Sequence, residues 1–291
     1  MNISESIYTV MLKPAPLRRA ANALIKAMLP QTVSVGGGVI WLNPDDPVIS
    51  GALSLGVYEK AEIAFFRRHF RKDMTFIDVG ANVGLYTAMA MATPDFRGKI
   101  IAVEPHGESR RYLLQTVAAN DRTGLGTVVV DSHAASDCTG SLRLFKNAGN
   151  KGDNRIYADS LLEEQEAIQG DTLDRICARH GVQSTQFVKI DVQGAEARVV
   201  AGATTLLKNS PNCILMTEFW PRGITDCGGD PLDYVASLLG LGFCLHELQG
   251  SVPALVPLES CEDLVRRNPG RHYANLIGLK GEFAGIALER S

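Results

Sequence analysis

The chain has 291 residues, and its 29 basic and 32 acidic side chains give a formal net charge of −3 at pH 7. This balance argues against a polybasic nucleic-acid binder, and an aromatic content of 7% is low for stacking on bases. Because no apolar run reaches about 18 residues, the sequence predicts no transmembrane helix. The first residues lack the basic start and apolar stretch of a secretory signal.

Six cysteines lie far apart between residues 138 and 261, without a C-x-x-C pair. This spacing favours buried thiols in a reducing compartment over a disulfide framework or a zinc site. We therefore expect a cytoplasmic protein.

The N-terminal part is predicted to form a helix and a hairpin. Residues 15–29 place apolar side chains on one helical face, as in a helix that docks on the main domain. A membrane-surface or targeting helix is the alternative. A hairpin is expected over Val33–Leu42, a turn-rich loop over residues 43–47 and a helix over Glu59–Phe70. We predict an extension over residues 1–55, acting as acceptor lid or homo-oligomer interface, and one domain over residues 56–291.

From residue 76 onward, short apolar runs alternate with helical patterns. This alternation is typical of an α/β fold whose parallel sheet is buried on both faces. The expected strands are 76–79, 100–103, 127–130, 187–192 and 213–219, followed by 242–248 and 273–279, which could close the sheet as a hairpin. An additional strand is expected at 142–145, and helices at 83–93, 108–120, 171–179 and 232–239.

Each of the first strands ends in a carboxylate. These residues are Asp78, Glu104, Asp131, Asp191 and Glu218. Since ligands of open parallel sheets bind beyond the carboxyl ends of the strands, the pattern predicts a ligand site at this edge.

A glycine-rich turn follows the first strand. Gly80 allows a tight turn and Gly84 allows the next helix to pack closely, but the third glycine of the dinucleotide fingerprint is missing. Glu104 lies 20 residues after Gly84, where an acid can bind ribose hydroxyls. Asp78 beside the turn suits a cationic sulfonium cofactor better than a pyrophosphate. The sequence thus favours S-adenosylmethionine over a nicotinamide dinucleotide.

The motifs that carry this pattern resemble those of the FkbM methyltransferases. They are FIDVGANVGLYT (76–87), AVEPHGE (102–108), DTLD (171–174), FVKIDVQGAE (187–196) and the acid of MTEFWP (216–221), over roughly residues 57–220. The resemblance implies a Rossmann-like class I methyltransferase fold with a mostly parallel, seven-stranded sheet and helices on both faces. It also implies S-adenosylmethionine-dependent methylation of hydroxyl oxygens on sugars, lipids or polyketides. Gln193 departs from the glutamate that is also frequent there.

The same resemblance implies roles for individual residues at the cofactor. Asp78, Gly80, Asn82 and Gly84 would surround the methionine part, and Glu104 would hold the ribose with Pro105 stiffening its loop. Ala134 would lie near the adenine, and Tyr58 and Glu59 would close over the cofactor. Asp191 is expected to border it.

Candidates for the acceptor side lie on the fourth and fifth strands. Alternation places Lys189 and Asp191 on one side, where an ion pair would fix Asp191. Asp191 is the expected catalytic group, either as general base or, with Glu218, as a ligand to Mg²⁺. Glu196 is either catalytic or a cap of the next helix.

Two other functions remain open from the sequence. One is a nicotinamide-dependent oxidoreductase on a Rossmann fold, and the other is a cofactor-binding subunit without catalysis. The expected partner is a small hydroxyl compound rather than a nucleic acid.

Overall fold

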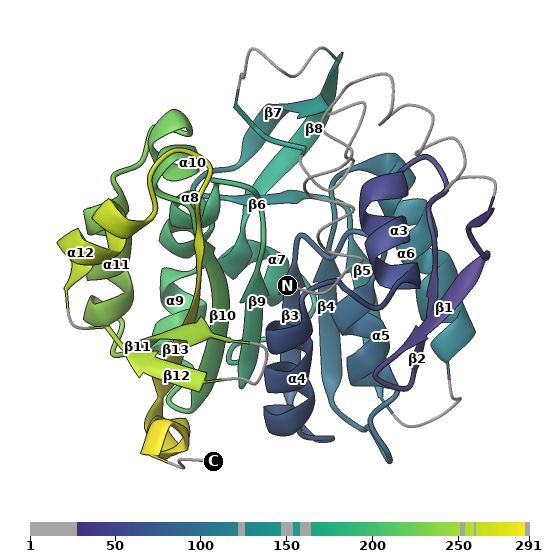
Figure 1. The fold of residues 1–291 in the computed structure, drawn as a ribbon, viewed down its shortest axis with the longest axis horizontal. Coiled ribbons are helices and arrows are strands. Elements are labelled where there is room, and N and C mark those ends of the chain that lie inside the picture. Colours follow the sequence, from purple (N-terminus) through teal and green to yellow (C-terminus); the bar gives the residue numbers. More distant parts are fainter. Residues whose placement is uncertain are drawn as a thin grey trace.

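A computed structural model describes residues 28–121, 126–146, 154–157, 164–250, 254–258 and 260–288 (Figure 1). Its centre is an eight-stranded sheet with the order β12-β11-β13-β10-β9-β3-β4-β5. The strands from β10 to β5 are parallel, whereas β13, β11 and β12 pair antiparallel to their neighbours. In sheet order these strands are Ala254–Pro257, Cys244–Gln249, Ala274–Lys280, Cys213–Phe219, Phe187–Ile190, Thr75–Val79, Lys99–Val103 and Thr127–Asp131.

Helices cover both faces of this sheet. One face packs against α7 (Leu173–Arg179), α8 (Glu196–Ala201), α9 (Thr204–Lys208), α10 (Pro221–Asp226), α11 (Pro231–Gly240) and α12 (Cys261–Arg267). The other packs against α4 (Lys60–His69), α5 (Leu85–Met91), α6 (Gly107–Asn120) and the 3-10 helix η2 (Gly281–Leu288). The Rossmann-like α/β architecture expected from the sequence is confirmed.

Alternation along the central strands decides which side chains share a face. Ile77 and Val188 enter the core beneath α7–α9, whereas Phe76 and Phe187 pack with Phe66 of α4. Asp78 and Lys189 therefore lie on the α4 face, and they are direct cross-strand partners in the register of β3 and β9.

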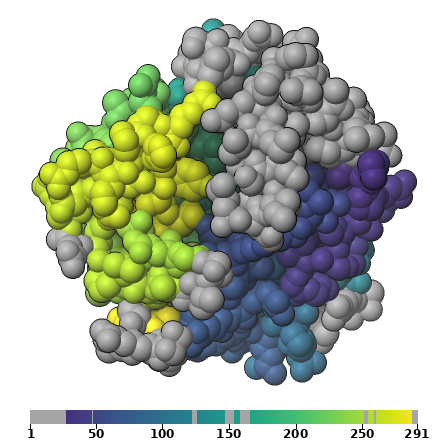
Figure 2. Space-filling view, viewed as in Figure 1, coloured from purple at the N-terminus to yellow at the C-terminus, as the bar shows by residue number. Residues whose placement is uncertain are grey.

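The N-terminal described segment forms a hairpin and a helix. The hairpin β1 (Thr32–Val35) and β2 (Gly38–Trp41) is joined to α6 by Asn120, whose amide exchanges hydrogen bonds with Val39. The helix α3 (Pro47–Ser54) follows, capped by Asp46. Figure 2 shows this segment in purple and the C-terminal residues in yellow on opposite flanks of one face.

A second sheet of three strands lies beyond the end of the main one (Figure 1). Its strands, in the order β6-β8-β7, are Ala134–Ser136, Glu164–Thr172 and Gly140–Lys146. The strand expected at 142–145 is confirmed as part of β7.

Several expectations need correction. The main sheet has eight strands rather than seven, because β12 adds an edge strand to β11. The strands β11 and β13 do pair directly in antiparallel orientation. They do not form a simple hairpin, because β12 and α12 lie between them in the sequence. Asp171 belongs to β8 instead of starting a helix, because β8 continues to Thr172, which caps α7. The helix expected over residues 15–29 lies outside the described residues, apart from its last two positions.

Candidate active site

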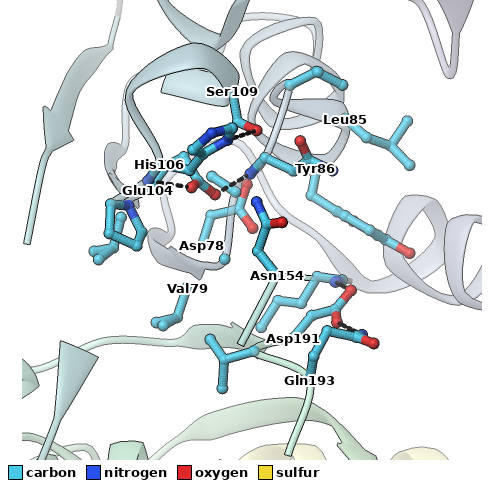
Figure 3. Close-up of a pocket in the computed structure, with 18 of the residues that line it drawn as sticks. Asp78, Val79, Leu85, Tyr86, Glu104, His106, Ser109, Asn154, Asp191 and Gln193 are labelled. Atoms are coloured by element: carbon cyan, nitrogen blue, oxygen red, sulfur yellow. Dashed lines mark hydrogen bonds and ion pairs between the residues drawn. The ribbon is translucent and has the colours of Figure 1, made fainter. Parts of the chain in front are cut away.

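A first hollow opens at the carboxyl ends of β3, β4 and β9 (Figure 3). Its empty space, counted together with the open solvent at its mouth, is about 1020 Å³. The predicted residues that line it are Tyr58, Glu59, Asp78, Gly80, Asn82, Glu104, Pro105, Ala134, Lys189 and Asp191. Ile49 and Leu53 of α3 also line it, so the N-terminal segment borders the site.

The turn after β3 forms the floor of this hollow and needs glycine at residue 80. Gly80 has φ +78°, and a Cβ there would lie 1.9 Å from the carbonyl oxygen of Asp191. The amides of Gly80 and Ala81 both donate to the carbonyl of Val103 on β4. The turn thus lies so close to β4 and β9 that residue 80 has no room for a side chain.

Gly84 has a packing role in this structure. It has φ +90°, and a Cβ would lie 2.7 Å from Cδ1 of Leu113 on α6. Gly84 is not among the residues that line the first hollow. It allows α5 to begin close against α6.

Glu104 joins the β3 turn to the loop after β4. Its carboxylate accepts hydrogen bonds from the amide nitrogens of Asn82, at 2.9 Å, and His106, at 2.8 Å. Burial raises the pKa of Glu104 to about 7, although these amides and Arg110 oppose the rise. The ring of His106 lies 3.0 Å from the hydroxyl of Ser109 and lines the same wall.

Asp78 is buried at the back of the first hollow. Its Oδ2 accepts hydrogen bonds from the amide and hydroxyl of Thr87 in α5, at 3.1 and 2.7 Å. Burial raises the pKa of Asp78, against the opposing effect of the nearby Lys189 ammonium. A cationic ligand in this hollow would favour the ionised form of Asp78.

Lys189 supplies the positive charge of the site. Its Nζ lies 2.9 Å from Oδ2 of Asp191 and 4.7 Å from the centre of the Tyr86 ring, whose hydroxyl donates to Glu59 at 2.6 Å. Burial lowers the pKa of Lys189, but Asp191, Glu59 and Asp78 together raise it above its ordinary value. The ion pair expected between Lys189 and Asp191 is thus present.

A second hollow adjoins the first on the side of β10 and β13. The two share Tyr58, Glu59, Lys189, Asp191 and Gln193, and the second is also lined by residues outside the first, among them Glu62, Glu218, Tyr273 and Asn275. The side-chain nitrogen Nε2 of Gln193 lies 2.9 Å from Oδ1 of Asp191 and 3.2 Å from Oε2 of Glu218. Gln193 therefore connects the strand-end carboxylates of β9 and β10.

The ionisation of these carboxylates differs. Burial would raise the pKa of Asp191, but the Lys189 ammonium and the Gln193 amide lower it below its ordinary value. Burial raises the pKa of Glu218 well above its ordinary value, and the charge of Asp191 adds to the rise. Asp191 is thus held as a carboxylate, whereas Glu218 favours a proton.

Glu196 lies away from both hollows. It is fully buried at the start of α8, and its carboxylate accepts hydrogen bonds from the amides of Val192, at 3.1 Å, and Gly194, at 3.0 Å. Burial raises its pKa to about 7, against these hydrogen bonds. Glu196 therefore holds the loop that presents Gln193.

Several residues of the site were not identified from the sequence. Tyr86 and Thr87 end the motif over residues 76–87 but were assigned no role, and each contacts an acid that the sequence did single out. Asn154 belongs to a short described segment and projects into the first hollow (Figure 3). Tyr273 and Asn275 reach the second hollow because β13 lies beside β10.

The expected magnesium site is not supported. Both oxygens of Asp191 accept hydrogen bonds from nitrogen donors, and one of these donors is the Lys189 ammonium. An ammonium 2.9 Å from the carboxylate disfavours a divalent cation at the same oxygen. Within the described residues, no group of three or more His, Cys, Asp or Glu side chains is arranged to hold a metal.

None of the helices in the described part of the chain is both long enough and apolar enough to cross a membrane.

Solved structures resemble the chain distantly. A methyltransferase FkbM from Methylobacillus flagellatus KT is 13% identical with a TM-score of 0.47, over 90% of this chain and 59% of that one. The O-methyltransferase TomG from Streptomyces achromogenes, in complex with SAM, is 13% identical with a TM-score of 0.43, over 77% and 80%. Aeropyrum pernix fibrillarin with bound S-adenosyl-L-methionine is 15% identical with a TM-score of 0.39, over 72% and 67%. These scores carry no functional assignment.

The sequence itself gives the assignment. No curated protein matches the chain significantly. Residues 78–229, more than half of the chain, match the model of the methyltransferase FkbM domain, and this stretch contains the β3 turn, Glu104, Lys189, Asp191 and Glu218. The chain belongs to the FkbM methyltransferase family.

Proposed function

We propose that the protein is an S-adenosylmethionine-dependent O-methyltransferase that acts on a hydroxyl group of a sugar, lipid or polyketide-type small molecule. The observation that carries this proposal is the pair of adjoining hollows, which share a wall formed by Tyr58, Glu59, Lys189, Asp191 and Gln193. A methyl transfer needs such an arrangement, because donor and acceptor must meet in line at one carbon atom.

The first hollow fits the cofactor. Glu104 offers a carboxylate to the ribose hydroxyls, and Asp78, Gly80 and Asn82 surround the methionine part. Pro105 and Ala134 contribute to the wall for the adenine side. When bound, S-adenosylmethionine supplies a methyl group on a positively charged sulfur. The acids of this hollow are favourable to that positive charge, whereas they would repel the negatively charged pyrophosphate of a dinucleotide.

The second hollow fits the acceptor. Asp191, Glu218 and Tyr273 are among the residues that line it. The acceptor oxygen forms a bond to the methyl carbon while the carbon–sulfur bond breaks, and the hydroxyl proton must pass to a carboxylate. Lys189 keeps Asp191 ionised at the boundary between the hollows.

Ligand binding distinguishes this proposal from its alternatives. Because a ligand that binds the native state raises the melting temperature, S-adenosylhomocysteine should stabilise the protein and NAD should not. Stabilisation by NAD alone would favour an oxidoreductase.

Turnover then separates an enzyme from a non-catalytic subunit. We expect label from methyl-labelled S-adenosylmethionine to be transferred to at least one alcohol in a panel of sugars, lipids and polyketide alcohols. Binding without transfer to any alcohol, but with transfer to amines or thiols, would contradict O-methylation. A cytoplasmic location and a homo-oligomeric state stay predictions from the sequence.

A further inference from the structure

Gln193 lies in the loop between β9 and α8, two residues after Asp191. Its Nε2 donates to Oδ1 of Asp191 at 2.9 Å and to Oε2 of Glu218 at 3.2 Å. An amide nitrogen carries two hydrogens, so both bonds can be formed at once. A glutamate here would offer no such donor and would add a third carboxylate between the other two.

The backbone of Gln193 is fixed in a conformation that presents this amide. Gln193 has φ +54°, and its carbonyl accepts a hydrogen bond from the hydroxyl of Tyr157 at 3.1 Å. The next residue, Gly194, has φ +103°, and its amide donates to the buried Glu196. The hydrogen bonds to Tyr157 and Glu196 thus fix the backbone of this loop at Gln193 and at Gly194. In this position the side chain of Gln193 reaches Glu218 on β10.

We infer that Gln193 positions Glu218 as the group that removes the proton of the acceptor hydroxyl. This inference rests on the proposed O-methyl transfer. Gln193 acts through Glu218 and is a positioning residue, whereas Glu218 contacts the acceptor.

Asp191 is unsuited to this role because its oxygens are already engaged. Oδ1 accepts from Gln193 and Oδ2 accepts from the Lys189 ammonium. These donors lower the pKa of Asp191, and a carboxylate with a lowered pKa is a weak base. Asp191 instead fixes the position of Gln193.

Glu218 has a free oxygen and faces the acceptor. It lines the second hollow and not the first. Oε2 is held by Gln193, while Oε1 accepts no hydrogen bond from any residue that the structure describes. The charged and titratable groups around it are Asp191, Glu196, Lys189, Glu59, Tyr273 and Tyr234. In the transfer, which requires the ionised form of Glu218, the acceptor O–H bond breaks and its proton goes to Oε1 of Glu218, while the acceptor oxygen binds the methyl carbon and the bond from that carbon to sulfur breaks. The proton passes to water when the product leaves.

The first experiment measures the proton affinity of Glu218 without any acceptor. Protein labelled with carbon-13 at the glutamate carboxyl carbon is titrated by NMR, and the resonance missing in Glu218→Gln identifies this group. We expect its midpoint above the ordinary glutamate value of 4.5. In Gln193→Met, which keeps the side-chain length but has no donor, the midpoint should move to still higher pH, because a hydrogen bond to the charged form is lost.

The matched control is Gln115→Met on the exposed surface of α6, which should leave the Glu218 midpoint unchanged. A wild-type midpoint in the ordinary glutamate range, or the same midpoint in wild type and Gln193→Met, would overturn the inference. Neither outcome depends on whether the protein binds S-adenosylmethionine.

The second experiment measures turnover on the alcohol that the wild-type enzyme methylates. Glu218→Gln should lower kcat by about 10²–10⁴-fold while the affinity for S-adenosylhomocysteine is kept. Gln193→Met should lower kcat and move the pH profile to higher pH in the same direction as the NMR midpoint. Full turnover in Glu218→Gln overturns the inference but leaves the O-methyltransferase proposal standing. Absence of cofactor binding in the wild type overturns the proposed function, and the NMR titration still decides the link between Gln193 and Glu218.

Discussion

Lys189 and Asp191 form an ion pair in the wall between the two hollows, with Nζ 2.9 Å from Oδ2. Alternation on β9 places the ammonium on the same face as Asp78, its partner in the register of β3. The ammonium of Lys189 also lies 4.7 Å from the centre of the Tyr86 ring, and the hydroxyl of Tyr86 donates a hydrogen bond to Glu59. The Lys189 ammonium thus interacts electrostatically with Asp191, Glu59 and Asp78.

Replacing Lys189 by methionine should therefore destabilise the fold. The change leaves Asp191 and Asp78 without their cation, and breaking a buried pair by removing one partner costs about 3–5 kcal/mol. We expect a loss of about 3 kcal/mol in the free energy of unfolding, because Asp191 is partly exposed. The measurement is urea unfolding at pH 7.

The control for this prediction is Lys72→Met, at an exposed position after α4, which should change stability by less than about 0.5 kcal/mol. Equal stability of the two variants would mean that Lys189 does not hold the acids together.

The β3 turn offers a second test, in which two glycines with similar backbone conformations are compared. Gly80 has φ +78° and Gly56 has φ +62°, but a Cβ at Gly56 would meet nothing within 4 Å. Gly56→Ala should cost roughly 1–2 kcal/mol for the left-handed conformation alone. Gly80→Ala should cost about 1–3 kcal/mol more, because its Cβ collides with the carbonyl of Asp191.

Thermal and urea unfolding of the two alanine variants measure this difference, and calorimetry with S-adenosylhomocysteine measures its effect on the site. We expect binding in Gly56→Ala and none in Gly80→Ala. Similar stability and affinity in both would show that the turn can move away from β9.

Elements that form around a strong local pattern could be predicted from the sequence. The apolar runs of β3 and β9 define buried strands, and their alternation correctly places Lys189 beside Asp191. Helix α3 was missed, although Asp46 followed by Pro47 is a regular cap and first position of a helix. Strand β12 was missed because it has four residues at the sheet edge.

Contacts that depend on strand register could not be predicted. The bridge from Gln193 to Glu218 spans 25 positions in sequence and needs β10 to pair with β9 in one register. Likewise, Tyr273 reaches the second hollow through the antiparallel pairing of β13 with β10. Neither contact leaves a pattern in a single sequence, because the residues lie on different elements.

The affinity for the cofactor should depend on pH through Glu104. Burial raises the pKa of this carboxyl to about 7 in the protein without ligand. Below that value Glu104 is protonated, and binding through an ionised carboxylate must first release the proton. The dissociation constant for S-adenosylhomocysteine should therefore fall as the pH rises from about 6 to 8 and level off above that. Calorimetry across this range measures the effect.

Glu104→Gln is the matched variant for this pH dependence. It should bind more weakly by about 1.5–3 kcal/mol, the usual contribution of hydrogen bonds to charged groups, and its affinity should no longer change around pH 7. If the variant kept the wild-type pH dependence, another group would be responsible for it. Glu59 is the first candidate, since burial raises its pKa to about 6.

Variants of Glu196 distinguish a structural from a catalytic role for this residue. Its carboxylate accepts hydrogen bonds from the amides of Val192 and Gly194, and it lines neither hollow. Glu196→Ala leaves these donors without a partner, so we expect a loss of at least about 1–3 kcal/mol in the free energy of unfolding. Glu196→Gln keeps one acceptor oxygen and should lose less. At a temperature where Glu196→Gln is folded, its kcat should stay within about tenfold of the wild type, since the loop that carries Gln193 is kept. A stable Glu196→Gln variant with kcat lowered by about 10²-fold or more would instead place Glu196 in the proton-transfer machinery.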